Sequence, residues 1–478
     1  MIIAKNIMKS YSGTPVLDGI NLKLGNNNKV ALVGRNGCGK STLIKILAGE
    51  LISDEGSVTK DGERIAYIPQ EFEFPNVMLG EYLEGLLLDT WDFYKVEKLL
   101  NDLEFKNYDE YQLISTLSDG QKMKVKVLEA LLEDPTTLLI DEPTNHLDIE
   151  GILWFENYIE KLSKTVLMIS HDREFLNHTV KEIWEIDNKK LISFAGNYDF
   201  YKEEKLKLID KWDDEYTRFI KRKNQLEELL IRARRMKISR KGGTSQVKSR
   251  IKREVENKKV EKHIEKNIKK IDFGKGVSHP KLMVKLEKVE KRYDQNIVFN
   301  DLNLEIRGGE KIWLFGPNGS GKTTLVKLLV GLEKISKGGL RLGKSISIGY
   351  FAQNQAILEQ EKKIITYFMD ETGCSYEQVF GELRNYLFEK DDLKKRIKSL
   401  SPGQRARFAF AVFAYKKYDM LILDEPGNHL DISTKEVLEE SLKKSKGTLL
   451  LISHDRYFIE KVGVTKVLNL KDGVLKEY

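Results

Sequence analysis

The sequence predicts an α/β protein in which two tandem copies of one domain are joined by an α-helical hairpin. Four short motifs occur twice, in the same order. In each copy an apolar run, a glycine-rich loop and a helical pattern follow one another, as in a strand–loop–helix unit. A basic segment with helical periodicity lies between the copies. We therefore expect a first domain over residues 1–202, a hairpin over 203–275 and a second domain over 276–478.

The duplication is visible in four pairs of motifs, within a chain of 478 residues that is long enough for two or three domains. The second copy follows the first at an offset of 282 residues for the glycine-rich loop and 283 for the other motifs. Such a constant register indicates a duplicated domain. The pairs are GRNGCGKST (34–42) with GPNGSGKTT (316–324), LSDGQ (117–121) with LSPGQ (400–404), LLIDEPTNHLDI (138–149) with LILDEPGNHLDI (421–432), and ISHDREF (169–175) with ISHDRYF (452–458).

The composition excludes several classes of protein. With 41% hydrophobic and 32% charged residues and only 9 prolines, the chain is globular rather than disordered. Its two cysteines, Cys38 and Cys374, are too few for a disulfide framework, which predicts a reducing, cytoplasmic location. Lys5 and Lys9 interrupt the start of the chain where a signal peptide needs an apolar core. No apolar run approaches the length of about 18 residues that a membrane span requires.

The segment between the copies holds the net positive charge of the chain. Residues 205–270 carry 23 Lys and Arg against 10 Asp and Glu, a net charge of +13, so the remainder has a net charge of −6. Apolar residues recur mostly every three or four positions on both sides of Gly242-Gly243, which predicts two antiparallel helices joined by a basic tip. The first would run from about residue 203 to 238 and reach roughly 50 Å. The periodic positions are Ile209, Trp212, Tyr216, Phe219, Leu226 and Leu230, then Val247, Ile251, Val255, Val260, Ile264 and Ile268.

Both glycine-rich loops match G-x-x-x-x-G-K-[ST], the phosphate-binding P-loop. Such a loop turns backbone N–H groups and a helix N-terminus toward the phosphates of a nucleotide. Lys40 and Lys322 would reach the β- and γ-phosphates, and the hydroxyls of Ser41 and Thr323 would bind Mg²⁺. We therefore predict two ATP–Mg²⁺ sites. Their loop residues are Gly34, Asn36, Gly37, Gly39, Lys40, Ser41 and Thr42, and Gly316, Asn318, Gly319, Gly321, Lys322, Thr323 and Thr324.

Each copy also contains candidates for a hydrolytic machinery. An apolar run typical of a buried parallel strand ends in Asp-Glu, and a second such run ends in Ser-His-Asp. The aspartate can hold Mg²⁺ through water, the glutamate can polarise the attacking water, and the histidine can contact the γ-phosphate. These residues are Asp141, Glu142 and His171 in the first copy and Asp424, Glu425 and His454 in the second.

A P-loop, LSxGQ, a strand ending in Asp-Glu-Pro and a strand ending in Ser-His-Asp resemble, in this order, the ATP-binding cassette family. The resemblance covers both halves of the chain. It implies that Gln70 and Gln353 are the Q-loop glutamines, which contact ATP and Mg²⁺. It also implies that Tyr11 and Tyr293 stack on adenine, although either tyrosine could instead be a core residue.

In that family two cassettes stack head to tail, and each ATP lies between the P-loop of one and the LSxGQ of the other. The resemblance implies that the two cassettes of this chain pair intramolecularly, in a monomer. Asp119 and Pro402 depart from the family's usual glycine, and Gly427 replaces the threonine present as Thr144, so the two sites could be unequal. Since both glutamates are present, we expect hydrolysis at both sites. The implied LSxGQ contacts to ATP are Ser118, Gly120, Gln121, Ser401, Gly403 and Gln404.

The tandem cassettes, the DEPTNHLD motif and the basic hairpin, without a membrane domain, resemble the ABC-F family. Its members bind the ribosome at the tRNA exit site, and their linker reaches toward the peptidyl-transferase centre and the P-site tRNA. A hairpin of this charge suits a phosphate backbone, although a merely solvated coiled coil is the alternative. The RNA-binding candidates are Arg232, Arg234, Arg235, Lys237, Arg240, Lys241, Lys248, Arg250, Lys252 and Arg253.

Two roles within that family remain open. One is a translation factor for stalled or initiating ribosomes, and the other is protection of the ribosome against antibiotics. Only 47 residues separate Gln70 from Ser118, and no basic extension follows the last expected strand, which resembles the resistance group somewhat more. The ATPase subunit of a transporter and a DNA-acting cassette ATPase are further alternatives. The basic hairpin argues against the first, and the lack of very long coiled coils or zinc sites within a cassette argues against the second.

Overall fold

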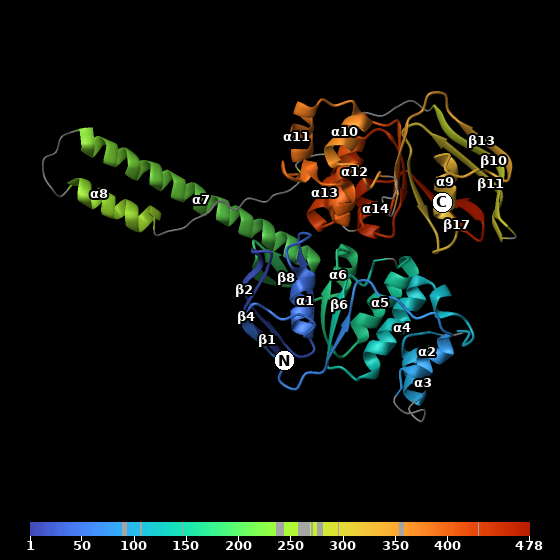
Figure 1. The fold of residues 1–478 in the computed structure, drawn as a ribbon, viewed down its shortest axis with the longest axis horizontal. Helices are drawn as coiled ribbons and strands as arrows, with labels where there is room; N and C mark the ends of the chain where they lie inside the picture. The colour runs from blue at the N-terminus through green and yellow to red at the C-terminus, as the bar shows by residue number, and fades with distance from the viewer. Residues whose placement is uncertain are drawn as a thin grey trace. The chain divides into compact units, whose positions relative to one another are not determined.

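The computed structural model describes residues 1–87, 93–105, 108–145, 147–235, 243–256, 268, 271–274, 281–294, 296–352, 358–428 and 430–478. The chain forms two compact units (Figure 1). One combines Met1–Asn197 with Asn267–Tyr478 and holds both cassettes. The other is the helical unit Tyr198–Lys266.

The first cassette is built on a six-stranded sheet of order β5-β6-β7-β3-β8-β9. All neighbouring strands run parallel except β8 and β9, which form an antiparallel edge. Every residue of β6 and β7 is buried, which explains their continuous apolar sequence. The strands are β3 (Lys29–Gly34), β5 (Ile65–Ile68), β6 (Thr137–Asp141), β7 (Thr165–Ile169), β8 (Glu182–Asp187) and β9 (Lys190–Ala195).

A small antiparallel sheet of order β2-β1-β4 completes the β-structure of this cassette. It shares a core with the large sheet and with the helix after the P-loop, through Ile7, Leu17, Leu32 and Leu43. Its strands are β1 (Ile2–Tyr11), β2 (Thr14–Leu24) and β4 (Glu55–Thr59). The helices are α1 (Lys40–Ala48), α2 (Leu79–Gly85), α3 (Phe93–Asp102), α4 (Asp119–Leu132), α5 (Ile149–Lys161) and α6 (Arg173–Thr179).

The second cassette repeats this architecture, which confirms the predicted duplication and the α/β fold class. Its sheet order, β14-β15-β16-β12-β17-β18, matches the first strand for strand, and its small sheet has the order β11-β10-β13. The strands are β10 (Leu282–Tyr293), β11 (Asn296–Arg307), β12 (Lys311–Phe315), β13 (Lys337–Leu342), β14 (Ile348–Phe351), β15 (Met420–Asp424), β16 (Thr448–Ile452), β17 (Lys466–Lys471) and β18 (Val474–Glu477). The helices are α9 (Lys322–Leu329), α10 (Ile364–Thr372), α11 (Tyr376–Arg384), α12 (Pro402–Lys416), α13 (Ile432–Lys444) and α14 (Arg456–Val462).

The helical unit contains two helices that pack side by side and antiparallel (Figure 1). α7 (Tyr198–Arg235) has 38 residues, or about 57 Å at 1.5 Å per residue, and starts some five residues before the predicted position. Asp199 in its first turn suits the positive end of the helix dipole. α8 (Gly243–Ile251) continues into a π-helical turn, Lys252–Glu256, and Arg222 of α7 pairs with Glu254 of this turn at 2.9 Å.

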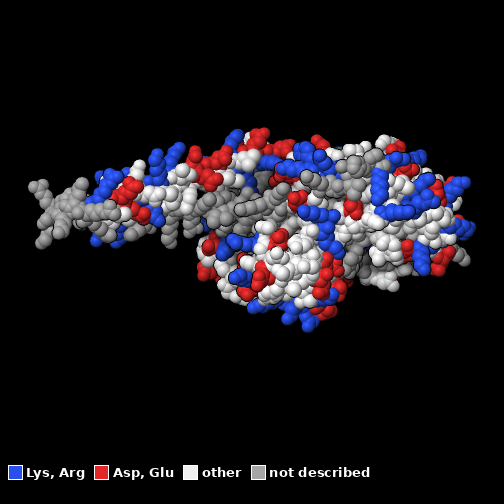
Figure 2. All heavy atoms as spheres, turned by 90° about the horizontal axis from the view of Figure 1, so that it is seen from above, with Lys and Arg blue, Asp and Glu red and all other residues white. Residues whose placement is uncertain are grey.

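The predicted apolar face of α7 coincides with its less exposed side. Leu226 is fully buried, and Trp212, Tyr216 and Phe219 are half-buried. Charge divides along the unit, because Asp210, Asp213, Asp214 and Glu215 lie in the first half of α7 and basic residues dominate after it. Figure 2 shows the same change from red to blue along this unit. The predicted apolar positions Val260 and Ile264 lie outside the described residues.

Within the described ranges, no helix combines the length and the apolar character needed to cross a membrane.

A glycine in β13 provides a test of the fold. Gly338 has a φ of +95°, where β10 and β13 shift register, and a Cβ there would lie 2.3 Å from the carbonyl oxygen of Lys288. Gly338→Ala should therefore lower the free energy of unfolding by about 2 kcal/mol or more, measured by thermal or urea unfolding. Gly339→Ala is the matched control, since its Cβ would meet nothing closer than 3.9 Å. Equal stability of the two variants would contradict the register shift.

Candidate active site

Each P-loop joins a central strand to a helix whose first residue is the motif lysine. β3 ends at Gly34 and α1 begins at Lys40. Gly39 caps α1 in the left-handed conformation, with a φ of +105°, and a Cβ there would lie 2.8 Å from side-chain atoms of Val16 and Leu17. Among the described residues, no side chain caps α1 or α9, so their first N–H groups can point at an anion.

The ammonium group of each P-loop lysine donates hydrogen bonds to backbone carbonyls at the start of its own loop. Lys40 Nζ donates to the carbonyl oxygens of Gly34 at 2.8 Å and Arg35 at 3.2 Å. Lys322 Nζ donates to those of Gly316 at 2.6 Å and Pro317 at 2.9 Å. Both lysines are buried, and both line the cavity between the cassettes, where phosphates can reach their ammonium groups.

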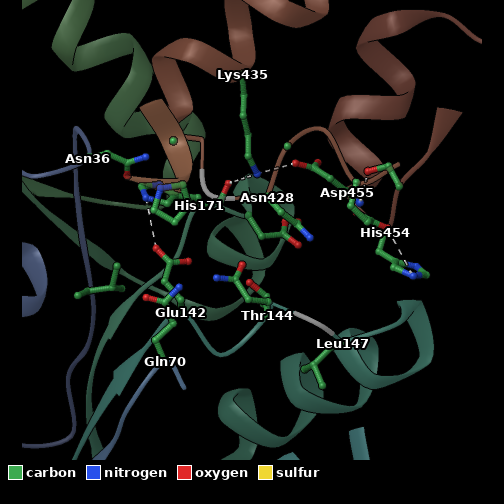
Figure 3. A pocket seen from close by; sticks show the side chains of 18 of the residues that line it. Asn36, Gln70, Glu142, Thr144, Leu147, His171, Asn428, Lys435, His454 and Asp455 are labelled. Carbon is green, nitrogen blue, oxygen red and sulfur yellow. Dashed lines mark hydrogen bonds and ion pairs between the residues drawn. The ribbon is translucent and has the colours of Figure 1, made fainter. Parts of the chain in front are cut away.

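One cavity of about 990 Å³ brings the two sets of predicted residues together (Figure 3). It is large enough for nucleotides and is lined by both cassettes. Its predicted residues are Tyr11, Asn36, Gly37, Gly39, Lys40, Ser41, Thr42, Gln70, Asp141, Glu142 and His171 from the first cassette, and Asn318, Gly319, Gly321, Lys322, Thr323, Thr324, Ser401, Gly403, Gln404, Asp424, Glu425 and His454 from the second.

Some predicted residues lie elsewhere. Gly34, Ser118, Gly120, Gln121, Tyr293 and Gly316 are not part of the cavity lining in the described portion of the chain. The Tyr293 ring instead lies 4.4 Å from the ammonium of Lys291, whereas Tyr11 lines the cavity. Gln353 lies outside the described residues.

The aspartates at the ends of β6 and β15 are suited to hold a cation. Asp141 accepts a hydrogen bond from Ser41, and Asp424 accepts one from Thr323. The second oxygen of each carboxylate, Asp141 Oδ1 and Asp424 Oδ2, is buried and has no hydrogen-bond partner among the described residues. Burial raises the pKa of Asp141 and raises that of Asp424 to about 6. A hydroxyl, a carboxylate and an unpaired buried oxygen fit Mg²⁺, which binds a few protein oxygens together with phosphates and water.

The neighbouring glutamates are held in an unusual backbone conformation. Glu142 has a φ of +50° and Glu425 a φ of +49°, values that are rare for residues other than glycine. Their N–H groups donate to the carbonyl oxygens of Ile169 and Ile452, both at 2.9 Å, which ties each glutamate to the next strand. Strain of this kind clusters at functional sites, because the surrounding structure must maintain it. The sequence did not signal it.

Each glutamate faces a histidine. His171 Nε2 lies 3.3 Å from Glu142 Oε1 (Figure 3), and His454 Nε2 lies 3.6 Å from Glu425 Oε1. Burial raises the pKa of Glu142 to about 7 and that of Glu425 to about 8. Burial also lowers the pKa of His454 to about 4, with a further contribution from Lys322. A carboxylate with a pKa near neutrality can accept a proton from water, as a general base requires.

The LSxGQ segments are helix starts. Ser118 caps α4 and Ser401 caps α12, each accepting from the backbone N–H of a glutamine at 3.3 Å, while that glutamine accepts from the serine N–H at 3.0 Å. The glutamines are Gln121 and Gln404, so S-x-x-Q is a capping box that was readable from the sequence. Pro402 is the first helical residue, where the missing N–H costs the helix little.

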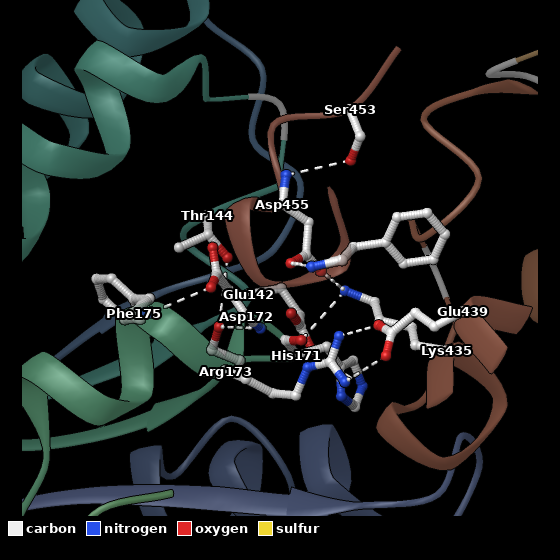
Figure 4. Close-up of polar contacts among 12 residues, drawn as sticks. Glu142, Thr144, His171, Asp172, Arg173, Phe175, Lys435, Glu439, Ser453 and Asp455 are labelled. Carbon is white, nitrogen blue, oxygen red and sulfur yellow. Dashed lines mark hydrogen bonds and ion pairs between the residues drawn. The ribbon is translucent and has the colours of Figure 1, made fainter. Parts of the chain in front are cut away.

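Contacts between the cassettes surround the cavity. The backbone N–H of Asn36 donates to Asp431 Oδ2 at 3.3 Å, which places the first P-loop against the second cassette. Arg173 forms a bidentate pair with Glu439 (Figure 4). Its guanidinium lies 4.1 Å from the centre of the Tyr457 ring.

A second pair repeats this contact at the 283-residue offset, because Arg456 contacts Glu156. Sequence reasoning missed both pairs, because nothing local in an Arg or Glu indicates a partner 266 or 300 residues away. The arginine of the ISHDR motif was the available signal.

The duplicated sheets, with a P-loop, an Asp-Glu pair and a histidine at the ends of adjacent strands, define a tandem ATP-binding cassette ATPase. The family model described as "ABC transporter" matches residues 17–145 and 299–428. ABC transporter F family member 5 of Arabidopsis thaliana is 34% identical over 529 residues, covering 99% of this chain and 75% of that protein. Putative ATP-binding protein YdiF of Bacillus subtilis (strain 168) is 31% identical over 536 residues, covering 100% and 81%.

The chain belongs to the ABC-F family, and it is an ATPase. A solved structure titled "Model of ribosome-bound archaeal Pelota and ABCE1" has the same fold. Its matching chain superimposes with a TM-score of 0.64 at 21% identity, covering 99% of this chain and 78% of that one.

Substitution of the two glutamates tests the site. Glu142→Gln and Glu425→Gln should each lower the turnover of ATP, measured as phosphate release, to about half or less. The double variant should lose about 100-fold or more, because an amide cannot act as a general base. Binding of ATP should persist in all three variants, which controls for folding. Full turnover by both single variants would contradict the assignment.

Proposed function

We propose that this ABC-F ATPase acts on the ribosome in the cytoplasm, binding at the tRNA exit site and directing its helical unit toward the peptidyl-transferase centre and the P-site tRNA. In each catalytic site Ser41 with Asp141, or Thr323 with Asp424, would hold Mg²⁺, with Gln70 and Gln353 as further contacts. Glu142 and Glu425 polarise water, and His171 and His454 face the γ-phosphate. The metal ion would neutralise charge on the phosphates when bound.

The observation that carries the proposal is the charge of the hairpin segment. Its net charge of +13 contrasts with −6 for the rest of the chain, which is the pattern expected for contacts to a phosphate backbone. Arg232 and Arg253 have side chains 71% and 74% exposed, and Lys248, Arg250 and Lys252 are exposed.

The remaining candidates add no structural support. The side chains of Arg234 and Arg235, and Lys237, Arg240 and Lys241 entirely, lie outside the described residues. The comparisons add that a protein of the same fold is named as ribosome-bound.

ATP controls binding, in this proposal, by favouring one arrangement of the cassettes. A ligand shifts a conformational equilibrium only by the difference between its affinities for the two states. A nucleotide that touches both cassettes in one cavity satisfies this condition, since it binds best when both are in place. Hydrolysis removes the γ-phosphate and with it that preference.

Co-sedimentation with ribosomes tests this function. The E142Q/E425Q variant with ATP should pellet with ribosomes, because it binds ATP without hydrolysing it, and it should pellet less with ADP. Replacing Lys248, Arg250 and Lys252 by serine should weaken the association and reduce its dependence on salt. The matched control replaces the exposed Lys5, Lys23 and Lys190 of the first cassette in the same way. Absence of ATP-dependent association would exclude the function and leave the transporter subunit or the DNA-acting ATPase.

We further propose that the protein protects the ribosome against antibiotics, with a translation factor as the alternative. The support is the short interval of 47 residues between Gln70 and Ser118, whose described residues include the short helices α2 and α3. Expression in a susceptible bacterium should raise the inhibitory concentration of at least one lincosamide, pleuromutilin, streptogramin A, macrolide or phenicol. The K40A/K322A variant is the control and should give no protection. Unchanged susceptibility to all five classes would favour the translation factor.

A further inference from the structure

One lysine of the second cassette reaches across the interface between the cassettes. Lys435 Nζ donates to the backbone carbonyl of His171 at 3.1 Å and pairs with Asp455 Oδ2 at 3.0 Å (Figures 3 and 4). Its side chain is only 8% exposed. Asp455 directly follows His454, so one ammonium contacts the histidine segments of both ATP sites.

The residues at and beside Lys435 differ from their counterparts in the first cassette, and the difference leaves room for the lysine side chain. Its counterpart in the first cassette, 283 residues earlier, is Ile152, and the counterpart of Gly427 is Thr144. A Cβ on Gly427 would lie 3.3 Å from Lys435 Cε, so a threonine there would crowd the lysine stem. In the first cassette the Thr144 hydroxyl instead lies 3.3 Å from Ser170 Oγ. The glycine at 427 and the lysine at 435, which both differ from the first cassette, thus depend on each other sterically.

Buried carboxyl groups near the Lys435 ammonium offset the cost of withdrawing its positive charge from water. Lys435 lowers the pKa values of Glu142, Asp172 and Asp455, three buried carboxyl groups drawn from both cassettes, against the effect of their desolvation. Asp455 Oδ1 meanwhile accepts from the N–H of Phe458 at 2.9 Å and caps α14, which fixes its other oxygen toward the lysine. Removing the ammonium would leave a buried carboxylate oxygen and a buried carbonyl without this donor.

We propose that Lys435 couples the two ATP sites. It joins the backbone of His171, which faces Glu142, to the residue after His454, which faces Glu425. A shift of either histidine segment stretches or relaxes a contact to the other, and no ammonium can occupy the place of Ile152 to form a second such link. Lys435 is therefore a positioning residue, and its effect on affinity must be reciprocal between the sites. The inference rests on the proposed roles of the two histidines and is independent of ribosome binding.

The test is equilibrium binding of ATP by calorimetry in the non-hydrolysing E142Q/E425Q background. With Lys435 present, the second ATP should bind about fivefold or more tightly than the first, within the usual range of coupling between sites. Lys435→Ile should bring that ratio close to one, and Lys435→Arg should restore part of it. Lys444→Ile is the matched control, because it makes the same change on the exposed face of the same helix, α13.

One further variant makes the test informative even if Lys435→Ile does not fold. If Lys435→Ile fails to fold, G427T/K435I copies the Thr144 and Ile152 pair of the first cassette into the second, and it should bind two ATP molecules without coupling. A purely structural role would lower both affinities together and preserve their ratio, which would overturn the proposal. Equal affinities with Lys435 present would also overturn it. No binding of ATP by the parent variant would instead contradict the ATP sites themselves.

Discussion

Burial of carboxylates at the floor of the cavity is the constraint on which the rest of the structure depends. Asp141 and Glu142, and likewise Asp424 and Glu425, are adjacent acids withdrawn from water, and the charged form of a buried carboxylate is costly without compensation. The parallel sheet provides compensation by placing the P-loop strand beside the strand that carries the histidine, which neighbours the strand that ends in the two acids. Lysine, helix N-terminus, hydroxyl and histidine thus converge on one edge, as in other open α/β sheets.

The features that the sequence predicted are those encoded locally. A P-loop needs a strand, a glycine-rich turn and a helix in succession, and all three are contiguous in the chain, so the position of Lys40 follows from the sequence alone. The order of four motifs likewise predicted the duplicated sheet. Features that depend on distant partners could not be predicted in this way. The pairing of Arg173 with Glu439 and the positive φ of Glu142 arise only when strands and cassettes pack.

The contacts between the two cassettes are not symmetric, although the chain is duplicated. Two arginine–glutamate pairs are related by the 283-residue offset, yet Arg173 is fully buried and Arg456 is 29% exposed. Truncating one partner of a buried pair is strongly destabilising, whereas partly exposed pairs contribute less. The two contacts are therefore equivalent in sequence and unequal in energy. Lys435 adds a positive charge on the second cassette's side of the same interface, where the first cassette has an isoleucine.

The helical unit differs from the cassettes in what stabilises it and in its net charge. Its long helix has one less exposed apolar face, around Leu226, and its ion pairs include one between Arg222 and Glu254, which joins this helix to the turn after α8. An exposed ion pair of this kind stabilises little, because solvent and salt screen it. Concentrating the net positive charge of the chain on such a unit, while the cassettes are net negative, gains nothing for folding. The charge therefore makes physical sense as a surface for a polyanion, which is the basis of the function proposed above.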